Sequence, residues 1–264
     1  ELMVYKENPE LIHTKIRVAF TPDEETGEFI ENFNIKTFAA DAAYTVDGDK
    51  PESIEISSFN AHNMTVEIVG HNVHPGSAKR IMINSIKMAT DLIKGLPVEE
   101  APETTEGYEG YYHVCEIKGN EAKTVLKLLI RDFDYDKSLE RVKFVAKLAK
   151  EIEANNPGSK VTVKSKEMYR NMKSYLEKFP DVINNAIEGI RRTGLIPDQP
   201  PVRGGTDGSQ LTLMGLPTPN LGTGGHNYHS KTEFVSIQDM KLCVANIINI
   251  LSVWAEKAAD GINK

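Results

Sequence analysis

The middle of the chain carries its most regular alternation of apolar and polar residues. Alternation with a period of two predicts strands that have one side facing solvent. The expected strands are residues 63–70, 108–118, 124–133 and 160–169. Gly119 and Asn120 lie between the second and third of them and are typical of a hairpin turn. This region therefore predicts a largely antiparallel sheet.

Two stretches of the same region carry apolar residues at helical spacing. Ser77 is expected to cap a helix that runs to Lys94, and a second helix is expected over residues 136–155. Together with the strands they give the order β-α-β-β-α-β, which is that of the ferredoxin-like fold. We therefore expect residues 55–169 to form a separate domain inserted into the chain.

The flanking residues, 1–54 and 170–264, predict a second α/β domain. The apolar run Ile16–Phe20 is rich in strand-forming residues and predicts a buried strand. Pro22 ends that strand, because proline has no N–H group to donate to a neighbouring strand. A second run ends at Asp47. Further strand and helix signals follow the insert, including a long final helix that Ser236 is expected to cap.

Carboxylates follow both of the strands expected before the insert. Asp23, Glu24 and Glu25 follow the first strand, and Asp47 ends the second. Ligands of open α/β sheets bind at the carboxyl ends of the strands. Three adjacent carboxylates repel one another unless a cation or a proton lies between them. A solvated acidic turn is the alternative for the first group, and Asp47-Gly48 is also a common turn pair.

Composition and charge narrow the function classes. The chain has 264 residues, of which 40% are hydrophobic and 26% charged, as in ordinary globular proteins. The net charge of -7 argues against nucleic acid as the main partner. No apolar run approaches the roughly 18 residues that a membrane helix needs. Cys115 and Cys243 lie in apolar patterns and are expected to be core thiols of a cytoplasmic protein.

The two flanks of the insert supply potential metal ligands. Glu24, Glu25 and Asp47 precede it, and His226 and His229 follow it. Carboxylate oxygens and neutral imidazole nitrogens suit Zn²⁺, with Mn²⁺ or Co²⁺ as alternatives. The pattern therefore indicates a metal site assembled from both ends of the chain.

Six motifs in this order resemble the dizinc M20 metallopeptidase family, and within it the tripeptide aminopeptidases, over essentially the whole chain. They are Asp-Glu-Glu-Thr-Gly (23–27), Tyr-Thr-Val-Asp-Gly (44–48), Asn-Val-His-Pro-Gly (72–76), Ile-Arg-Asp-Phe-Asp (130–134), Arg-Gly-Gly-Thr-Asp-Gly (203–208) and Asn-Tyr-His-Ser (227–230). The resemblance implies an α/β catalytic zinc-peptidase domain, formed by residues 1–54 and 170–264. It also implies that residues 55–169 form a ferredoxin-like lid and dimerisation domain.

The resemblance also implies roles for single residues around two zinc ions per active site. Glu24 matches the general base, and Glu25 and Asp47 match metal ligands, one for each zinc. His229 matches the histidine ligand of the second zinc, and the motif favours it over His226.

Three further residues match substrate-contacting positions. His74 matches a lid-domain histidine that steadies the oxyanion, and a turn histidine before a helix is the alternative. Arg203 and Arg131 match residues that bind the carboxylate of the peptide, a task that suits a bidentate guanidinium. A surface ion pair of Arg131 with Asp132 or Asp134 is the alternative.

One part of the family pattern has no match in this sequence. Relatives carry a His-x-Asp zinc motif and a bridging aspartate before the acidic loop, whereas His13 is the only histidine there. We therefore expect this chain to be the carboxyl-terminal part of the enzyme, with an incomplete catalytic domain that is inactive alone. The expected partners are tripeptides and a second copy bound through the lid domain. A related dipeptidase or deacylase, or a non-catalytic dimerisation module, are the alternatives.

Overall fold

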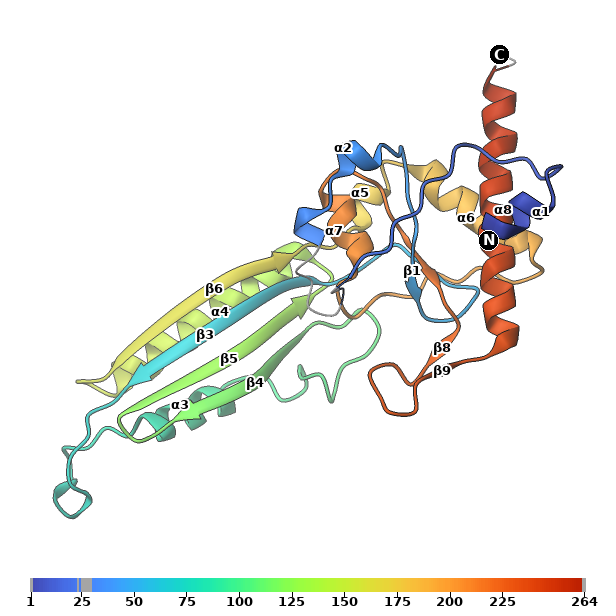
Figure 1. The fold of residues 1–264 in the computed structure, drawn as a ribbon. Coiled ribbons are helices and arrows are strands. Elements are labelled where there is room, and N and C mark those ends of the chain that lie inside the picture. The colour runs from blue at the N-terminus through green and yellow to red at the C-terminus, as the bar shows by residue number, and fades with distance from the viewer. Residues whose placement is uncertain (1, 23, 25–29, 263–264) are drawn as a thin grey trace. The chain divides into compact units, whose positions relative to one another are not determined.

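The computed structural model describes residues 2–22, 24 and 30–262, and the chain divides into two compact units (Figure 1). One unit consists of Glu1–Ser58 and Met172–Lys264, and the other of Phe59–Asn171. Both contain helices and strands, so the expected α/β class is confirmed.

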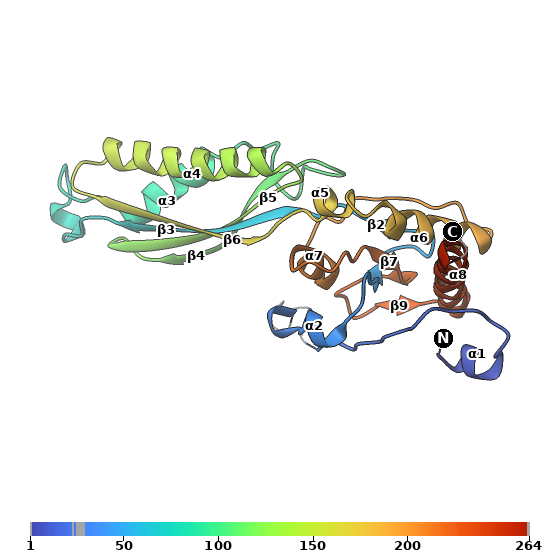
Figure 2. The ribbon, with the colours of Figure 1, turned by 90° about the horizontal axis from the view of Figure 1, so that it is seen from above.

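The unit Phe59–Asn171 has a four-stranded sheet in the order β4-β5-β3-β6, in which every neighbouring pair is antiparallel. The helices α3 and α4 lie on one face of this sheet (Figure 2). The elements are β3 (Asn60–Val69), η3 (Pro75–Ser77), α3 (Ser85–Lys94), β4 (Tyr111–Gly119), β5 (Lys123–Asp132), α4 (Tyr135–Asn155) and β6 (Lys160–Tyr169). The predicted order β-α-β-β-α-β is therefore correct.

The core of this unit lies between the sheet and its two helices. Alternate side chains of β3 and β5 point towards the helices and are buried, while their neighbours lie on the other face. The buried members are Met64, Val66, Ile68, Leu126, Leu128 and Ile130, and they pack with Met88, Ala89, Leu92, Val145, Ala149 and Ile152 of the helices. Burying each large aliphatic side chain contributes about 1.5–3 kcal/mol.

The predicted start of the first helix at Ser77 is wrong. Ser77 ends the short 3-10 helix η3, and Arg80 then adopts a left-handed backbone conformation with a φ of 65°. The helix α3 begins only at Ser85. Asn84 caps it, because its Oδ1 accepts from the N–H group of Ile86 at 2.9 Å.

The other unit has a small mixed sheet in the order β1-β7-β2 and a separate hairpin of β8 and β9. Its strands are β1 (Thr45–Gly48), β2 (Ile54–Glu55), β7 (Asn220–Gly222), β8 (Gly225–His226) and β9 (Phe234–Val235). Its helices are α1 (Leu2–Glu7), η2 (Ile30–Asn32), α2 (Ile35–Phe38), α5 (Lys173–Leu176), α6 (Pro180–Arg192), α7 (Asp207–Leu213) and α8 (Ile237–Ile262). Ser236 accepts from the Asp239 N–H group at 3.0 Å, as expected of the cap of the last helix.

The helices α6 and α8 pack together and cover this sheet. The buried centre of the contact is formed by Ile54, Leu221, Ile190, Ile250 and Ala186.

The 24 residues Ile237–Asp260 of α8 are long and apolar enough, by length and composition, to cross a membrane. Within the most apolar 18-residue stretch of this segment, 22% of the residues are buried. One such helix is weak evidence for a membrane span, because core helices of globular domains meet the same criteria.

The predicted strand Ile16–Phe20 is not formed. These residues belong to no strand or bridge among the described residues, and the Phe20 side chain is 93% exposed. β-forming side chains stabilise a strand only when they pack against a neighbouring strand, and within the described part of the chain this segment has none.

Glu55 is an exception to the apolar core of this unit, since only 6% of the residue is exposed. Its Oε2 accepts from Asn220 Nδ2 at 2.6 Å, and its Oε1 accepts from the backbone N–H group of Asp49 at 3.3 Å. Burial raises the pKa of Glu55 above its usual value of 4.5, and the negative charges of Asp47 and Asp49 act in the same direction. Glu55 therefore supports the turn after β1 from inside the fold.

The raised pKa predicts the sign of a pH effect on stability. The folded protein holds the proton of Glu55 more tightly than the unfolded chain. The stability that the folded protein gains from this tighter proton binding is complete below the unfolded pKa and is lost as the pH rises through the folded pKa. In Glu55→Gln the effect is absent, so the variant should gain stability relative to the wild type as the pH rises from about 4 to about 8. Urea denaturation at several pH values measures the difference.

Glu67→Gln is a matched control of opposite sign. The exposed Glu67 carboxylate pairs with Lys123 Nζ at 2.8 Å, which lowers the pKa of Glu67. This variant should therefore lose stability relative to the wild type as the pH rises towards 4.5, the usual pKa of the group, and change little above it. The account of Glu55 is wrong if Glu55→Gln follows the direction of Glu67→Gln.

Candidate active site

The candidate site lies where β1 and β7 end side by side. These strands are parallel, with Val46 opposite Leu221 and Gly48 opposite Gly222. Asp47 is left without an opposite residue, so it is the extra residue of a bulge. A bulge redirects a side chain out of the regular alternation, and Asp47 is exposed at the edge of the sheet to which both carboxyl ends point.

The segment after β7 returns to this edge as a tight turn, residues 227–230, which we call the histidine turn. The Ser230 N–H group donates to the Asn227 carbonyl at 3.1 Å. Asn227 and His229 both have left-handed backbone conformations, with φ of 57° and 61°. The N–H group of His229 donates to Glu233 Oε2 at 2.9 Å, and the His229 residue is exposed.

Tyr228 joins the histidine turn to the end of β1. Its hydroxyl donates to the Gly48 carbonyl at 3.0 Å and lies 2.8 Å from Thr223 Oγ1. Burial raises the pKa of Tyr228, and the charges of Asp49 and Asp47 add to the increase. The structure therefore brings the histidine turn next to the turn that begins at Asp47 and Gly48, which we call the Asp47 turn.

A second long-range contact joins Thr21, just before the acidic motif, to α7. The hydroxyl of Thr21 donates to Asp207 Oδ2 at 2.8 Å, and Asp207 is buried at the start of α7. Glu24 and Arg203 are both half-buried. This bond places the beginning of the acidic loop beside the glycine-rich motif that contains Arg203. Glu25 lies outside the described residues.

The described residues alone do not form a metal site. Among them, no group of three or more histidine, cysteine, aspartate or glutamate side chains is close enough to hold one ion. The Asp47 carboxylate and the His229 imidazole suit zinc chemically, but they do not complete a ligand set within this part of the chain. No reaction step through a metal follows from these residues.

His226 has a different environment from His229. Its ring stacks on Phe234 with centroids 4.9 Å apart, and its Nε2 is 3.9 Å from Asp239 Oδ2. These contacts give His226 a structural role in the short hairpin of β8 and β9.

The remaining two candidates belong to the unit Phe59–Asn171. Nδ1 of the exposed His74 accepts from the Gly76 N–H group at 3.1 Å, so the proton of a neutral ring resides on Nε2. Arg131 donates to the carbonyls of His62 and Ile130, and its guanidinium lies 5.7 Å from the centroid of the Tyr169 ring.

The two aspartates suggested as ion-pair partners of Arg131 have other contacts in the structure. Asp132 Oδ2 accepts from Arg141 Nε at 2.8 Å, and the Asp132 side chain is only 6% exposed. The Asp134 side chain accepts from the Lys137 N–H group and caps α4.

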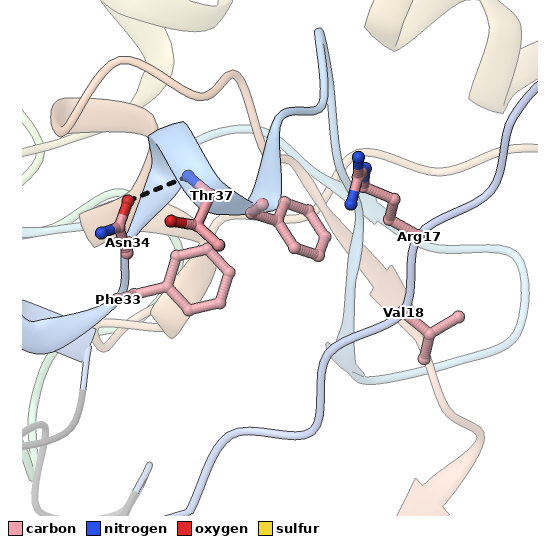
Figure 3. A pocket seen from close by; sticks show the side chains of 6 residues that line it. Arg17, Val18, Phe33, Asn34 and Thr37 are labelled. Carbon is pink, nitrogen blue, oxygen red and sulfur yellow. Dashed lines mark hydrogen bonds between the residues drawn. The ribbon is translucent and has the colours of Figure 1, made fainter.

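The cavity in Figure 3 is lined by other residues than the candidate site. It has a volume of about 480 Å³ and lies between an extended segment and α2. Its lining residues are Arg17, Val18, Phe33, Asn34, Thr37 and Phe38. None of the predicted site residues lines it.

Comparison with protein families gives a match within the chain. Residues 56–160 match the peptidase dimerisation domain of the M20 peptidases. The match covers the ferredoxin-like sheet and its two helices, up to the first residue of β6.

Comparison with characterised proteins gives relatives along nearly the whole chain. Peptidase T of Clostridium perfringens is 45% identical over 250 residues, which are 95% of this chain and 62% of that protein. Peptidase T of Brevibacillus brevis is 43% identical over 95% of this chain and 61% of its own length. Peptidase T of Salmonella gallinarum is 41% identical over 97% of this chain and 63% of its own length. This chain thus spans somewhat less than two thirds of each relative.

Solved structures share the fold. A tripeptidase from Staphylococcus aureus superposes with a TM-score of 0.86 at 21% identity, and covers 97% of this chain and 68% of its own. A dinuclear metal-binding peptidase of the M20 family from Bacillus subtilis superposes with a TM-score of 0.65 at 15% identity, over 90% of this chain and 64% of its own. The chain is therefore similar in fold to M20 peptidases and similar in sequence to peptidase T over nearly its whole length.

Proposed function

We propose that the protein is a metal-dependent aminopeptidase that removes the N-terminal residue from tripeptides. The observation that carries this proposal is the identity of 41–45% to peptidase T over 95–97% of the chain. Two contacts support it: that of Tyr228 with Gly48 joins the motifs at 227–230 and 44–48, and that of Thr21 with Asp207 joins the chain just before the acidic motif to the motif at 203–208.

Glu24 is proposed as the general base. It accepts a proton from the attacking water and passes it to the leaving amine. Its half-buried position next to an anchored loop suits a group that must face substrate without full solvation. Arg203 is proposed to bind the carboxylate at the far end of the peptide, which would set the length of the substrate.

His74 and Arg131 are proposed as substrate-binding residues of the dimerisation domain. The tautomer of His74 leaves Nε2–H as a donor, which suits an oxyanion. Arg131 is the weaker candidate, since its guanidinium already donates to the carbonyls of His62 and Ile130.

Zinc is proposed as the metal, with two ions per active site. Glu25, Asp47 and His229 are the proposed ligands from this chain, and bound zinc would activate water and polarise the peptide carbonyl. A neighbour in fold is described as a dinuclear metal-binding peptidase, which supports the number of ions but not their identity.

The proposed partner is a second copy of the chain, bound through the dimerisation domain at residues 56–160. The net charge of -7 disfavours binding to nucleic acid, whose phosphates are also negatively charged. A cytoplasmic location is proposed, in keeping with two free cysteines among the described residues.

Glu24→Gln tests the role of the base. In a preparation of the protein that hydrolyses tripeptides, this change should lower kcat by about 10²–10⁴-fold, because a positioned general base contributes that much. The KM should change little, since the substituted side chain has nearly the same shape. Steady-state kinetics with an unblocked tripeptide measure both constants.

Glu10→Gln serves as the control for this substitution. Glu10 is exposed and follows α1, outside all six motifs. Its variant should keep the kinetic constants of the wild type. Full turnover by Glu24→Gln would remove Glu24 from the reaction.

Metal analysis tests whether this chain holds the complete ligand set. We propose that the 264-residue chain alone is inactive and binds fewer than two zinc ions tightly, because the described residues contain no group of three ligands. Equilibrium dialysis followed by elemental analysis gives the number of bound ions. Two tightly bound ions per chain would contradict the proposal.

A panel of dipeptides, tripeptides, tetrapeptides and N-acyl amino acids distinguishes the alternative functions. Preference for tripeptides with a free amino group supports the proposal. Preference for dipeptides or acylated substrates indicates a different hydrolase of the same fold. Failure of every substrate, in a preparation that binds two zinc ions and still dimerises, indicates a non-catalytic dimerisation module.

A further inference from the structure

We infer that Tyr228 is a positioning residue that holds the histidine turn against the Asp47 turn. This inference deepens the proposed function and rests on it for the meaning of His229 and Asp47. The hydrogen bonds of Tyr228 themselves are properties of the fold, so they are testable without any activity.

The histidine turn has an unfavourable backbone conformation. His229 has a φ of 61° at a position where glycine would be less strained, and Asn227 has a φ of 57° two residues earlier. Such conformations persist only where the surroundings hold them, and they gather at functional sites. The turn therefore needs contacts that fix it.

Among the described residues, three side-chain contacts bear on the position of the turn. Asn227 Nδ2 lies 3.3 Å from the Thr232 carbonyl, and Glu233 Oε2 accepts from the His229 N–H group at 2.9 Å. Both of these contacts are local. Only the third, from the hydroxyl of Tyr228 to the Gly48 carbonyl, reaches a residue 180 positions away.

The oxygen atoms of Gly48, Thr223 and Tyr228 form a triangle. The Tyr228 hydroxyl is 3.0 Å from the Gly48 carbonyl oxygen and 2.8 Å from Thr223 Oγ1, and Thr223 Oγ1 is 2.8 Å from the same carbonyl. With the Tyr228 hydroxyl donating to the Gly48 carbonyl, the Thr223 hydroxyl has two arrangements, because it donates either to the same carbonyl or to the Tyr228 oxygen. Because each arrangement uses the Tyr228 hydroxyl, its removal breaks the triangle.

The ring of Tyr228 is also fitted to its place. A Cβ atom added at Gly225 would lie 2.5 Å from the Tyr228 hydroxyl oxygen and 2.7 Å from the ring carbon Cζ. Such a close approach is available only to glycine. The backbone of β8 thus makes room for the ring, and the ring directs the hydroxyl to Gly48.

Asp47 and His229 are direct chain neighbours of the two bonded residues. Asp47 precedes Gly48, whose carbonyl accepts the bond, and His229 follows Tyr228, whose hydroxyl donates it. The bond therefore fixes the bulge residue and the strained histidine with respect to each other. Its loss should release the histidine turn while the sheet and the helices remain folded.

Tyr228→Phe in the full chain tests this inference, with hydrogen–deuterium exchange as the first readout. Exchange of the amides in residues 226–233 should accelerate by about five- to tenfold, which is the factor that one neutral hydrogen bond provides. The melting temperature and the exchange of β3 and β5 should stay as in the wild type. Unchanged exchange in residues 226–233 would overturn the inference.

Two variants serve as controls. Tyr175→Phe removes a tyrosine hydroxyl from the same unit, where the ring stacks on Phe179, and should leave residues 226–233 unchanged. Thr223→Ser keeps the hydroxyl of the triangle and should also behave as the wild type. Equal acceleration in Tyr175→Phe would show a general loosening and would overturn the specific role of Tyr228.

Kinetics in a tripeptide-hydrolysing preparation provide the second readout. A positioning role predicts that Tyr228→Phe lowers kcat by about tenfold and leaves KM within about twofold. Equal kcat in variant and wild type would contradict that role. If a wild-type preparation that holds two zinc ions per active site hydrolyses no peptide while exchange accelerates as expected, the proposed function fails and the anchoring of the turn stands.

Discussion

The parallel pairing of β1 with β7 is the constraint on which the candidate site depends. Parallel strands send their carboxyl ends to the same edge of a sheet, so residues 47 and 223 begin their turns side by side although they are far apart in sequence. The bulge at Asp47 and the hydrogen bond from Tyr228 to Gly48 then fix which side chains lie at this edge. Glu55 supports the same turn from the buried side.

The alternation of residues predicted the fold of the unit Phe59–Asn171 well. A sheet covered on one face by helices imposes a period of two on its strands; β5 carries that period along its whole length, and β3 carries it from His62 to Val69. The start of α3 was missed because Ser77 and Asn84 are both good caps. The residues between them leave the helical path, with Arg80 in a left-handed conformation and Ile83 bridged to His71.

The same method failed at residues 16–20 and was incomplete at the candidate site. Strand propensity in Ile16–Phe20 does not show whether a neighbouring strand is present. The motifs identified residues worth testing, but contacts such as that of Thr21 with Asp207 join positions 186 residues apart and leave no periodic trace in the sequence. Glu55 was missed because a single acidic residue between two isoleucines has no signature of burial.

The most direct test of the account is a crystal structure of a tripeptide-hydrolysing preparation of the protein, grown with zinc, with anomalous scattering measured at the zinc edge. The account predicts zinc peaks with Asp47 oxygen and His229 nitrogen atoms at about 2.0–2.2 Å, with Glu25 among the ligands. Asp47 and His229 side chains that lie far from every zinc peak would contradict the assignment of this edge as the active site.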